Sequence, residues 1–124
     1  MIVEGYGSML SGIKNSFSKE HMLYIDEEIG KHGGSKKIAN IDCLKLSSVF
    51  NKYQIKKIDF LSIDTEGHEI QVLNGIDFGN TEIELISIEL DYTREKKVEE
   101  FLKERGFERI LRIQTDILFR KKSL

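Results

Sequence analysis

An α/β domain with a mainly parallel sheet is the fold class that this sequence predicts. Two apolar runs of strand length, 58–63 and 83–90, are each followed by a segment with apolar residues at helical spacing. Strands that alternate with helices are typical of parallel sheets. Two further short runs, 107–113 and 116–120, are separated by two residues, which permits only an antiparallel pair. The prediction is therefore a mainly parallel sheet that ends in a C-terminal antiparallel hairpin.

Composition indicates one globular domain and argues against two classes of partner. The chain has 124 residues, of which 40% are hydrophobic and 32% are charged. A formal net charge of −2 and the lack of a basic face argue against nucleic acid. No apolar run approaches the ~20 residues that a membrane span needs, and the N-terminus lacks the pattern of a signal peptide. The lone Cys43, expected in a strand, suits a reducing, cytoplasmic location.

Two regions differ in their patterning. Residues 1–36 are rich in Gly and Ser and show weak periodicity, so we predict an irregular lead-in of loops and short helix on the substrate side. Residues 37–124 are strongly patterned and carry the fold.

The patterned region begins with a predicted strand and a short helix. The strand spans 38–46, and Ser47 is placed to cap the helix that follows. One face of this helix carries Val49, Phe50 and Tyr53.

The central strand, 58–63, leads into the second predicted helix. Ile70 and Leu73 lie three residues apart on that helix, and Gly75 is placed to end it in the left-handed conformation.

The strand 83–90 is apolar on both faces and precedes the clearest predicted helix. Thr93 is placed to cap the start of this helix and Gly106 to end it. Its apolar stripe consists of Val98, Phe101 and Leu102.

Acidic residues follow both central strands. Asp64 and Glu66 follow the first strand, and Glu89 and Asp91 lie at the end of the second. Ligands of open parallel sheets bind beyond the carboxyl ends of the strands, so these carboxylates are expected to line one crevice. An acid that ends a buried strand, as Asp64 does, must reach water, a partner or a ligand.

Some acidic residues and the histidine of this segment also have a structural explanation. Glu66 and Glu69 complement the positive end of a helix, and His68 in a first turn is expected to be exposed. Oxygen ligands from the group Asp64 to Glu69 suit a divalent cation, but their spacing matches no specific metal motif.

A long motif carries a family resemblance. Residues 58–75 read IDFLSIDTEGHEIQVLNG and resemble the FkbM methyltransferase pattern IDFLKIDVEGxExxVLxG. The preceding residues resemble the family's LDDLLxxYxIxKI segment, except that Ser47 and Ser48 replace its acidic pair. The resemblance covers roughly 38–120.

The resemblance implies a Rossmann-like fold and methyl transfer from S-adenosylmethionine to the hydroxyl of a small molecule or glycan. It makes Asp64 and Glu66 the catalytic candidates, with His68, Glu89 and Asp91 on the substrate side. A carboxylate acts as general base there only if its pKa is raised or a metal assists.

The family's glycine-rich DxGAxxG cofactor loop is absent from this sequence, and no apolar strand is predicted before Gly5-Tyr6-Gly7. We therefore expect a partial Rossmann-like fold, the C-terminal half of the methyltransferase domain, with the N-terminal cofactor half missing. The alternative is a non-catalytic half-domain that forms a homo-oligomer or binds a partner through the unpaired side of the strand 58–63.

Overall fold

The computed structural model describes residues 1–5 and 8–123, which form two compact units. The N-terminal unit contains residues 1–43 and the short loop 65–68. The C-terminal unit contains residues 44–64 and 69–124. Tyr6 and Gly7 of the Gly5-Tyr6-Gly7 run lie outside the described residues.

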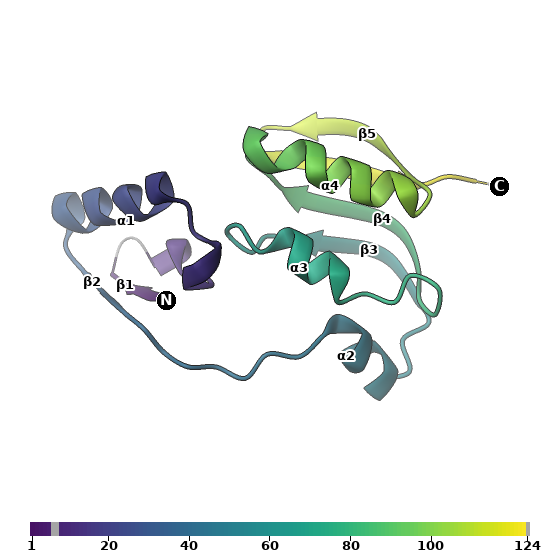
Figure 1. Cartoon of the computed structure of the whole chain (residues 1–124), viewed down its shortest axis with the longest axis horizontal. Helices are drawn as coiled ribbons and strands as arrows, with labels where there is room; N and C mark the ends of the chain where they lie inside the picture. Colours follow the sequence, from purple (N-terminus) through teal and green to yellow (C-terminus); the bar gives the residue numbers. More distant parts are fainter. Residues whose placement is uncertain (6–7, 124) are drawn as a thin grey trace. The chain divides into compact units, whose positions relative to one another are not determined.

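The C-terminal unit is built on a four-stranded sheet with the order β3-β4-β6-β5 (Figure 1). Its strands are β3 (Lys57–Ile63), β4 (Glu82–Glu89), β5 (Phe107–Ile113) and β6 (Asp116–Lys121). The α/β class and the C-terminal hairpin are confirmed. The predicted predominance of parallel pairing is not found among the described strands: β3 and β4 pair parallel, whereas β6 pairs antiparallel with both β4 and β5. The hairpin folds back so that β6 lies next to β4. Strand β6 therefore forms antiparallel pairs on both of its sides.

Three helices belong to this unit: α2 (Leu46–Lys52), α3 (Glu69–Asn74) and α4 (Tyr92–Glu104). Helices α3 and α4 lie over one face of the sheet (Figure 1). Alternate residues of the strands point to that face and are buried with one side of each helix. The core includes Ile63, Leu73, Ile86, Ile88, Val98, Leu102, Ile117 and Phe119, all at most 3% exposed.

Strand β3 lies at the edge of this sheet, with only β4 beside it among the described strands. Phe60, near the middle of β3, is 55% exposed. The predicted unpaired side of this strand is therefore present in the described part of the chain.

The N-terminal unit is more regular than the sequence predicts. It contains the antiparallel pair β1 (Ile2–Glu4) and β2 (Ser35–Lys37), two 3-10 turns (Ser8–Leu10 and Lys14–Ser16) and the 14-residue helix α1 (Lys19–His32). Ser18 caps α1 by accepting a hydrogen bond from the backbone N–H of His21. The helix was missed because its periodicity is weak: Ile25 is fully buried, while Leu23 and Tyr24 are exposed.

The strand predicted over 38–46 does not form. Residues 38–45 have no regular structure, and Ile38, Ile41 and Leu44 are exposed (Figure 1). An alternating sequence makes a strand only where a neighbour supplies hydrogen bonds, and no described strand lies beside this segment. Cys43 is consequently an exposed free thiol rather than a small apolar residue of a strand.

Two predicted helix boundaries are wrong for one shared reason. Ser47 does not cap α2, since the residue before the helix is Lys45. The N–H of Ser47 instead donates to the carbonyl oxygen of Gly75 at 2.8 Å. Gly75 does not adopt the left-handed conformation. A Cβ atom there would lie 3.2 Å from the carbonyl oxygen of Val72, so glycine at this position permits a close approach of the backbones.

The boundaries of α4 are half as predicted. Asp91 rather than Thr93 caps its start, because the Asp91 carboxylate accepts from the N–H groups of Thr93 and Arg94. Gly106, with φ of 82°, ends the helix in the left-handed conformation as predicted. No helix of the described chain is long and apolar enough to cross a membrane.

Candidate functional site

The structure brings Asp64 and Glu89 together at the carboxyl ends of β3 and β4. Ile63 and Ile88 are partners in the parallel register, so the residues that follow them emerge side by side. The Asp64 carboxyl lies near enough to Glu89 to raise the pKa of the Glu89 carboxyl. Two carboxylates side by side repel each other, so the proximity of Asp64 favours the protonated form of Glu89.

Two residues that the sequence does not single out complete this acidic pair. The hydroxyl of Thr115 donates to Oε1 of Glu89 at 3.1 Å. Asp116 is the partner of Glu89 in the β4–β6 ladder, and its Oδ1 accepts from the hydroxyl of Ser87 at 3.3 Å. Burial raises the pKa of Glu89, the Asp64 and Asp116 carboxylates raise it further, and the Thr115 hydroxyl opposes the shift.

Asp91, two residues after Glu89, has a different environment. Its Oδ1 caps α4, and its Oδ2 accepts from Nε and Nη2 of Arg94 at 3.0 and 2.7 Å. Partial burial works against the charged form of Asp91. The hydrogen bonds from Arg94 and Thr93 outweigh it and hold the pKa of this carboxyl at about 2. Asp91 therefore remains charged and has a clear role in helix capping, while its predicted contact with substrate stays a prediction.

Glu69 is the most deeply buried acid of the motif. It lies in the first turn of α3, its side chain is 2% exposed, and its Oε2 accepts from Nη1 of Arg94 at 2.6 Å. The position of Glu69 at the start of a helix does not by itself explain why its side chain is buried. A buried carboxylate also needs a partner of opposite charge, which Arg94 provides.

Glu66 and His68 belong to the N-terminal unit, although they are close to Asp64 in sequence. Oε2 of Glu66 lies 3.7 Å from Nδ1 of His21, and Nδ1 of His68 lies 2.5 Å from the hydroxyl oxygen of Ser16. His68 is therefore half-buried and hydrogen-bonded rather than freely exposed.

The backbone of the loop 65–68 is strained. Glu66 has φ of 50°, a left-handed conformation that L side chains rarely adopt, and Gly67 has φ of 104°. Such residues occur preferentially at functional sites, where surrounding contacts hold them in place. Gly12 is one source of these contacts, since a Cβ at Gly12 would lie 3.2 Å from Cβ of Glu66.

The residues missed by sequence reasoning share one property. Each contacts the predicted site from a distant part of the chain, and the set comprises Ser16, His21, Thr115 and Asp116. No local pattern identifies them. Arg94 is the exception, because its spacing of three residues from Asp91 places both on one helix face.

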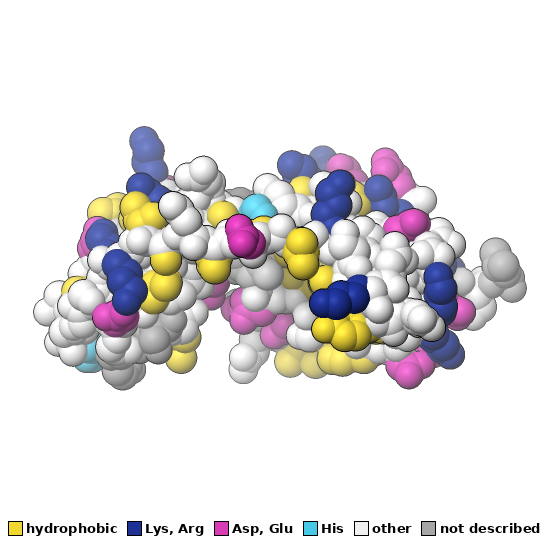
Figure 2. All heavy atoms as spheres, turned by 90° about the horizontal axis from the view of Figure 1, so that it is seen from below, with side chains coloured by type: hydrophobic (Ala, Val, Ile, Leu, Met, Phe, Trp, Pro, Cys, Tyr) yellow, Lys and Arg dark blue, Asp and Glu magenta, His cyan; other side chains and the backbone are white. Residues whose placement is uncertain are grey.

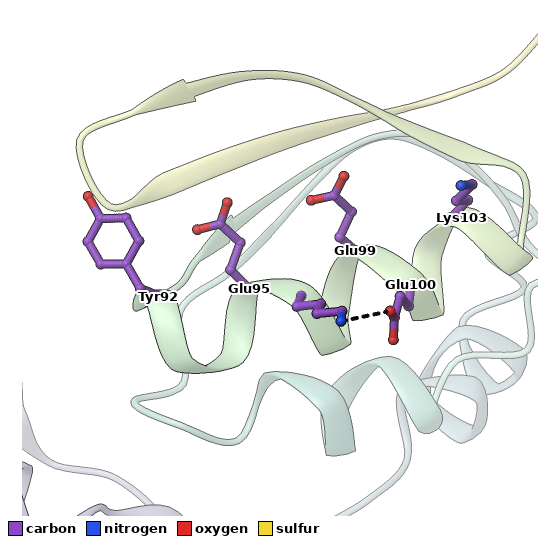
Figure 3. Close-up of a pocket in the computed structure, with 6 residues that line it drawn as sticks. Tyr92, Glu95, Glu99, Glu100 and Lys103 are labelled. Carbon is purple, nitrogen blue, oxygen red and sulfur yellow. Dashed lines mark ion pairs between the residues drawn. The ribbon is translucent and has the colours of Figure 1, made fainter.

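Other hollows lie elsewhere in the described chain, one of them of about 560 Å³ in the N-terminal unit. A groove of about 500 Å³ runs along α4 and is lined by Tyr92, Glu95, Lys96, Glu99, Glu100 and Lys103 (Figure 3). Its acids have partners: Glu95 pairs with Arg109 and Arg112, and Glu100 with Lys96. Acidic and basic side chains are interspersed on the face shown in Figure 2.

The sequence lacks the glycine-rich loop expected for the cofactor, and no metal-ligand cluster is found in the described part of the chain. No group of three or more His, Cys, Asp or Glu side chains among residues 1–5 and 8–123 is arranged to hold a metal ion, so the cation site considered for Asp64 to Glu69 is not present there. A strand, β1, does precede Gly5, contrary to prediction, but a Cβ at Gly34 would lie 2.2 Å from the carbonyl oxygen of Glu4. These glycines let β1 and β2 approach each other.

A family model decides the relationship of this chain to known proteins. The model of the methyltransferase FkbM domain matches residues 4–109, which is most of the chain. The chain belongs to the FkbM methyltransferase family. No curated protein and no solved structure shows a significant match.

The family match extends beyond the segment that the motif alone identified. It begins at residue 4 rather than near 38, so α1 and the turns of the N-terminal unit lie within the matched range, whereas Ile2 and Val3 of β1 precede it. It ends at residue 109, and β6 with Thr115 and Asp116 therefore lies outside the matched range. The family implies S-adenosylmethionine as methyl donor in general.

Proposed function

We propose that this chain is the acceptor side of an S-adenosylmethionine-dependent methyltransferase that methylates a hydroxyl oxygen of a small molecule or glycan. The observation that carries the proposal is the Asp64–Glu89 carboxyl pair at the ends of two parallel strands in an FkbM-family domain. A hydroxyl is a weak nucleophile and must lose its proton as the new bond forms. The Glu89 carboxyl, whose pKa is raised by burial and by the nearby Asp64, is better suited to take that proton than an ordinary carboxylate.

In this proposal Asp64 faces the acceptor hydroxyl and the proton passes into the Asp64–Glu89 pair. S-adenosylmethionine supplies the methyl group when bound. Glu66, two residues after Asp64, orients the acceptor, and the strained backbone at this residue is consistent with a functional constraint. His68, Glu89 and Asp91 complete the substrate side. Alignment of the acceptor oxygen accounts for most of the rate, as in other group transfers.

We propose that the cofactor is held by an N-terminal half whose motif this sequence lacks. That half belongs either to the same protein or to a partner. The absent DxGAxxG loop and the packed glycines at β1 and β2 support this view. A cytoplasmic location is proposed from the single free thiol, Cys43, which a reducing compartment would keep unpaired.

The test is methyl transfer from S-adenosylmethionine with a labelled methyl group to a panel of sugar, polyketide, lipid and peptide hydroxyls. Asp64→Asn is expected to reduce kcat by about 10²- to 10⁴-fold, the usual contribution of a general base. The matched control is Asp59→Asn on the same strand, whose side chain is 86% exposed and pairs only loosely with Lys57; it should retain the parent rate.

Two outcomes count against the proposal. Full turnover by Asp64→Asn would remove this residue from the reaction. The absence of transfer to every acceptor, together with no heat when the folded chain is titrated with S-adenosylhomocysteine, would reject methyl transfer by this chain alone.

A second function is favoured by the exposed edge of β3. A strand edge with unpaired backbone groups and a half-exposed Phe60 is a template for a further strand. The chain would then be a non-catalytic half-domain that forms a homo-oligomer or pairs with a partner. Light scattering tests this alternative: a dimer that Phe60→Lys dissociates supports it, and a monomer at high concentration contradicts it.

A further inference from the structure

The side chain of Arg94 joins the start of α3 to the start of α4. Its Nη1 donates to Oε2 of Glu69 at 2.6 Å, and its Nε and Nη2 donate to Oδ2 of Asp91 at 3.0 and 2.7 Å. Three directional, charge-assisted hydrogen bonds thus converge on one guanidinium group. Only arginine has donors spread widely enough to serve two carboxylates in this way.

The burial of Glu69 makes this connection hard to break. The Glu69 side chain is 2% exposed and that of Arg94 is 34% exposed. Burial of a carboxylate is costly unless a positive group pairs with it, and the attraction within such a pair is weakly screened. The start of α3 is therefore held against α4 by a short contact rather than by apolar packing alone.

Helices α3 and α4 begin shortly after the ends of β3 and β4, where the acidic residues lie. Glu69 comes five residues after Asp64 at the end of β3, and Asp91 comes two residues after Glu89 at the end of β4. The parallel ladder holds the strands together up to Ile63 and Ile88. Beyond those residues the ladder ends, and the Arg94 contacts hold the chains that leave the strands.

We propose that Arg94 is a positioning residue that sets the spacing between Asp64 and Glu89 by clamping Glu69 to Asp91. This inference rests on the proposed function for its catalytic meaning, but the positional effect exists whether or not the chain transfers methyl groups. Arg94 touches neither carboxyl of the Asp64–Glu89 pair in this arrangement and acts through the two helix starts.

The experiment is a carbon-13 NMR titration of the Glu89 side-chain carboxyl in the parent chain, Arg94→Met and Arg94→Lys. The groups that face Glu89 are Asp64 from β3, Asp116 from β6 and the Thr115 hydroxyl from the β5–β6 turn. The matched control is Arg120→Met, which removes an arginine whose side chain is 58% exposed and pairs with Glu108.

The direction of the shift separates positioning from simple charge loss. Removal of a nearby positive charge by itself raises a carboxyl midpoint. If Arg94 positions the pair, its loss lets Asp64 and Glu89 separate and solvates them, so the Glu89 midpoint falls toward its ordinary value. We expect a fall in Arg94→Met, a smaller fall in Arg94→Lys, which keeps the charge but loses the fork, and no change in Arg120→Met.

An unchanged or raised midpoint in folded Arg94→Met overturns the proposal. If Arg94→Met does not fold, Glu69→Gln and Arg94→Lys decide it by the same measurement, since the neutral amide of Glu69→Gln can remain buried. In an active preparation, Arg94→Lys should lower kcat on the order of 10²-fold with little change in KM, because misplacement affects the reacting groups more than binding. An inactive parent chain would reject the proposed function while the NMR titration still judges the role of Arg94.

Discussion

Glu89 and Asp91 lie two residues apart at the end of the same strand, and their environments drive them in opposite directions. Glu89 is partly buried beside two other carboxyls, Asp64 and Asp116, and its pKa is raised. Asp91 accepts hydrogen bonds from a helix start and from a guanidinium group, and its pKa is lowered to about 2. Glu89 thus takes up a proton more readily than an ordinary glutamate, and Asp91 takes one up less readily than an ordinary aspartate.

The difference shows how one short segment, residues 89–91, carries both a candidate proton acceptor and a residue that fixes the start of a helix. A carboxylate whose charge is fully satisfied, as in Asp91, is a poor base and a good anchor. A carboxyl crowded by like charges, as in Glu89, is less stable in its ionised form and more useful for proton transfer. Titratable neighbours whose pKa values are pushed apart are a recurrent mark of acid–base sites.

The largest effect on stability is expected from loss of the ion pair between Arg94 and the buried Glu69. Arg94→Met leaves the Glu69 carboxylate buried without this partner and should lower the free energy of unfolding by about 3 kcal/mol, the lower end for a buried pair because Arg94 is one-third exposed. Chemical denaturation measures this loss. Arg120→Met, at an exposed pair, should cost less than about 1 kcal/mol. Equal losses in both variants would mean that the Glu69–Arg94 contact is an ordinary surface pair.

A moderate effect is expected from substitutions that separate the two roles of Asp91. Asp91→Ala removes the helix cap and should destabilise the chain by about 1 kcal/mol, whereas Asp91→Asn keeps an oxygen for the cap but loses the charge and the Oδ2 acceptor of two Arg94 hydrogen bonds.

The dependence of stability on pH shows whether the charge of Asp91 stabilises the folded state. Because the pKa of Asp91 is lowered from 3.8 to about 2, its stabilisation is present above pH 3.8 and is lost as the pH falls through 2. Denaturation of Asp91→Asn should lack this loss. The same acid dependence in parent and variant would assign it to other carboxyls.

The smallest effect is expected at Glu89, and its sign is opposite. Glu89 and Asp116 are directly opposite in an antiparallel ladder, where like charges destabilise by about 0.2–1 kcal/mol. Glu89→Gln should therefore make the folded state slightly more stable at neutral pH, since the Thr115 hydroxyl can still donate to the amide oxygen.

The linkage follows from the raised pKa of Glu89. A group whose folded pKa is above its unfolded value favours the folded state at low pH, and that contribution is lost as the pH rises from 4.5 through the folded pKa. Thermal melts of parent and Glu89→Gln across this range measure the effect. A variant less stable than the parent at every pH would show that the Glu89 charge is favourable.

Sequence reasoning was most successful where structure is local. The strand before Asp64, the strand before Asp91, the helix with Val98 and Leu102 and the left-handed Gly106 follow from periodicity and capping over a few residues. It failed where a distant neighbour decides the outcome. The segment 38–45 alternates like a strand but has no strand beside it, and β6 reaches β4 only through the tertiary fold.

The same division applies to the candidate site. The carboxyl-end rule identified Asp64 and Glu89 before their contact was known, because parallel strands align their ends. The opposite pKa shifts of Glu89 and Asp91 were not predictable, since they depend on Asp116 from β6 and on the orientation of the Arg94 side chain. A pattern along the chain indicates where acids gather and leaves their individual roles to the packing around them.

The most direct test of this account is an NMR titration that follows the side-chain carboxyl carbons of Glu89 and Asp91 in the same sample. The account predicts that Glu89 titrates above 4.5 and Asp91 near 2, so that the two curves are well separated. Two curves with midpoints near the ordinary values of Glu and Asp would contradict it, because neither the crowding of Glu89 by neighbouring carboxyls nor the contact of Asp91 with Arg94 would then exist in solution.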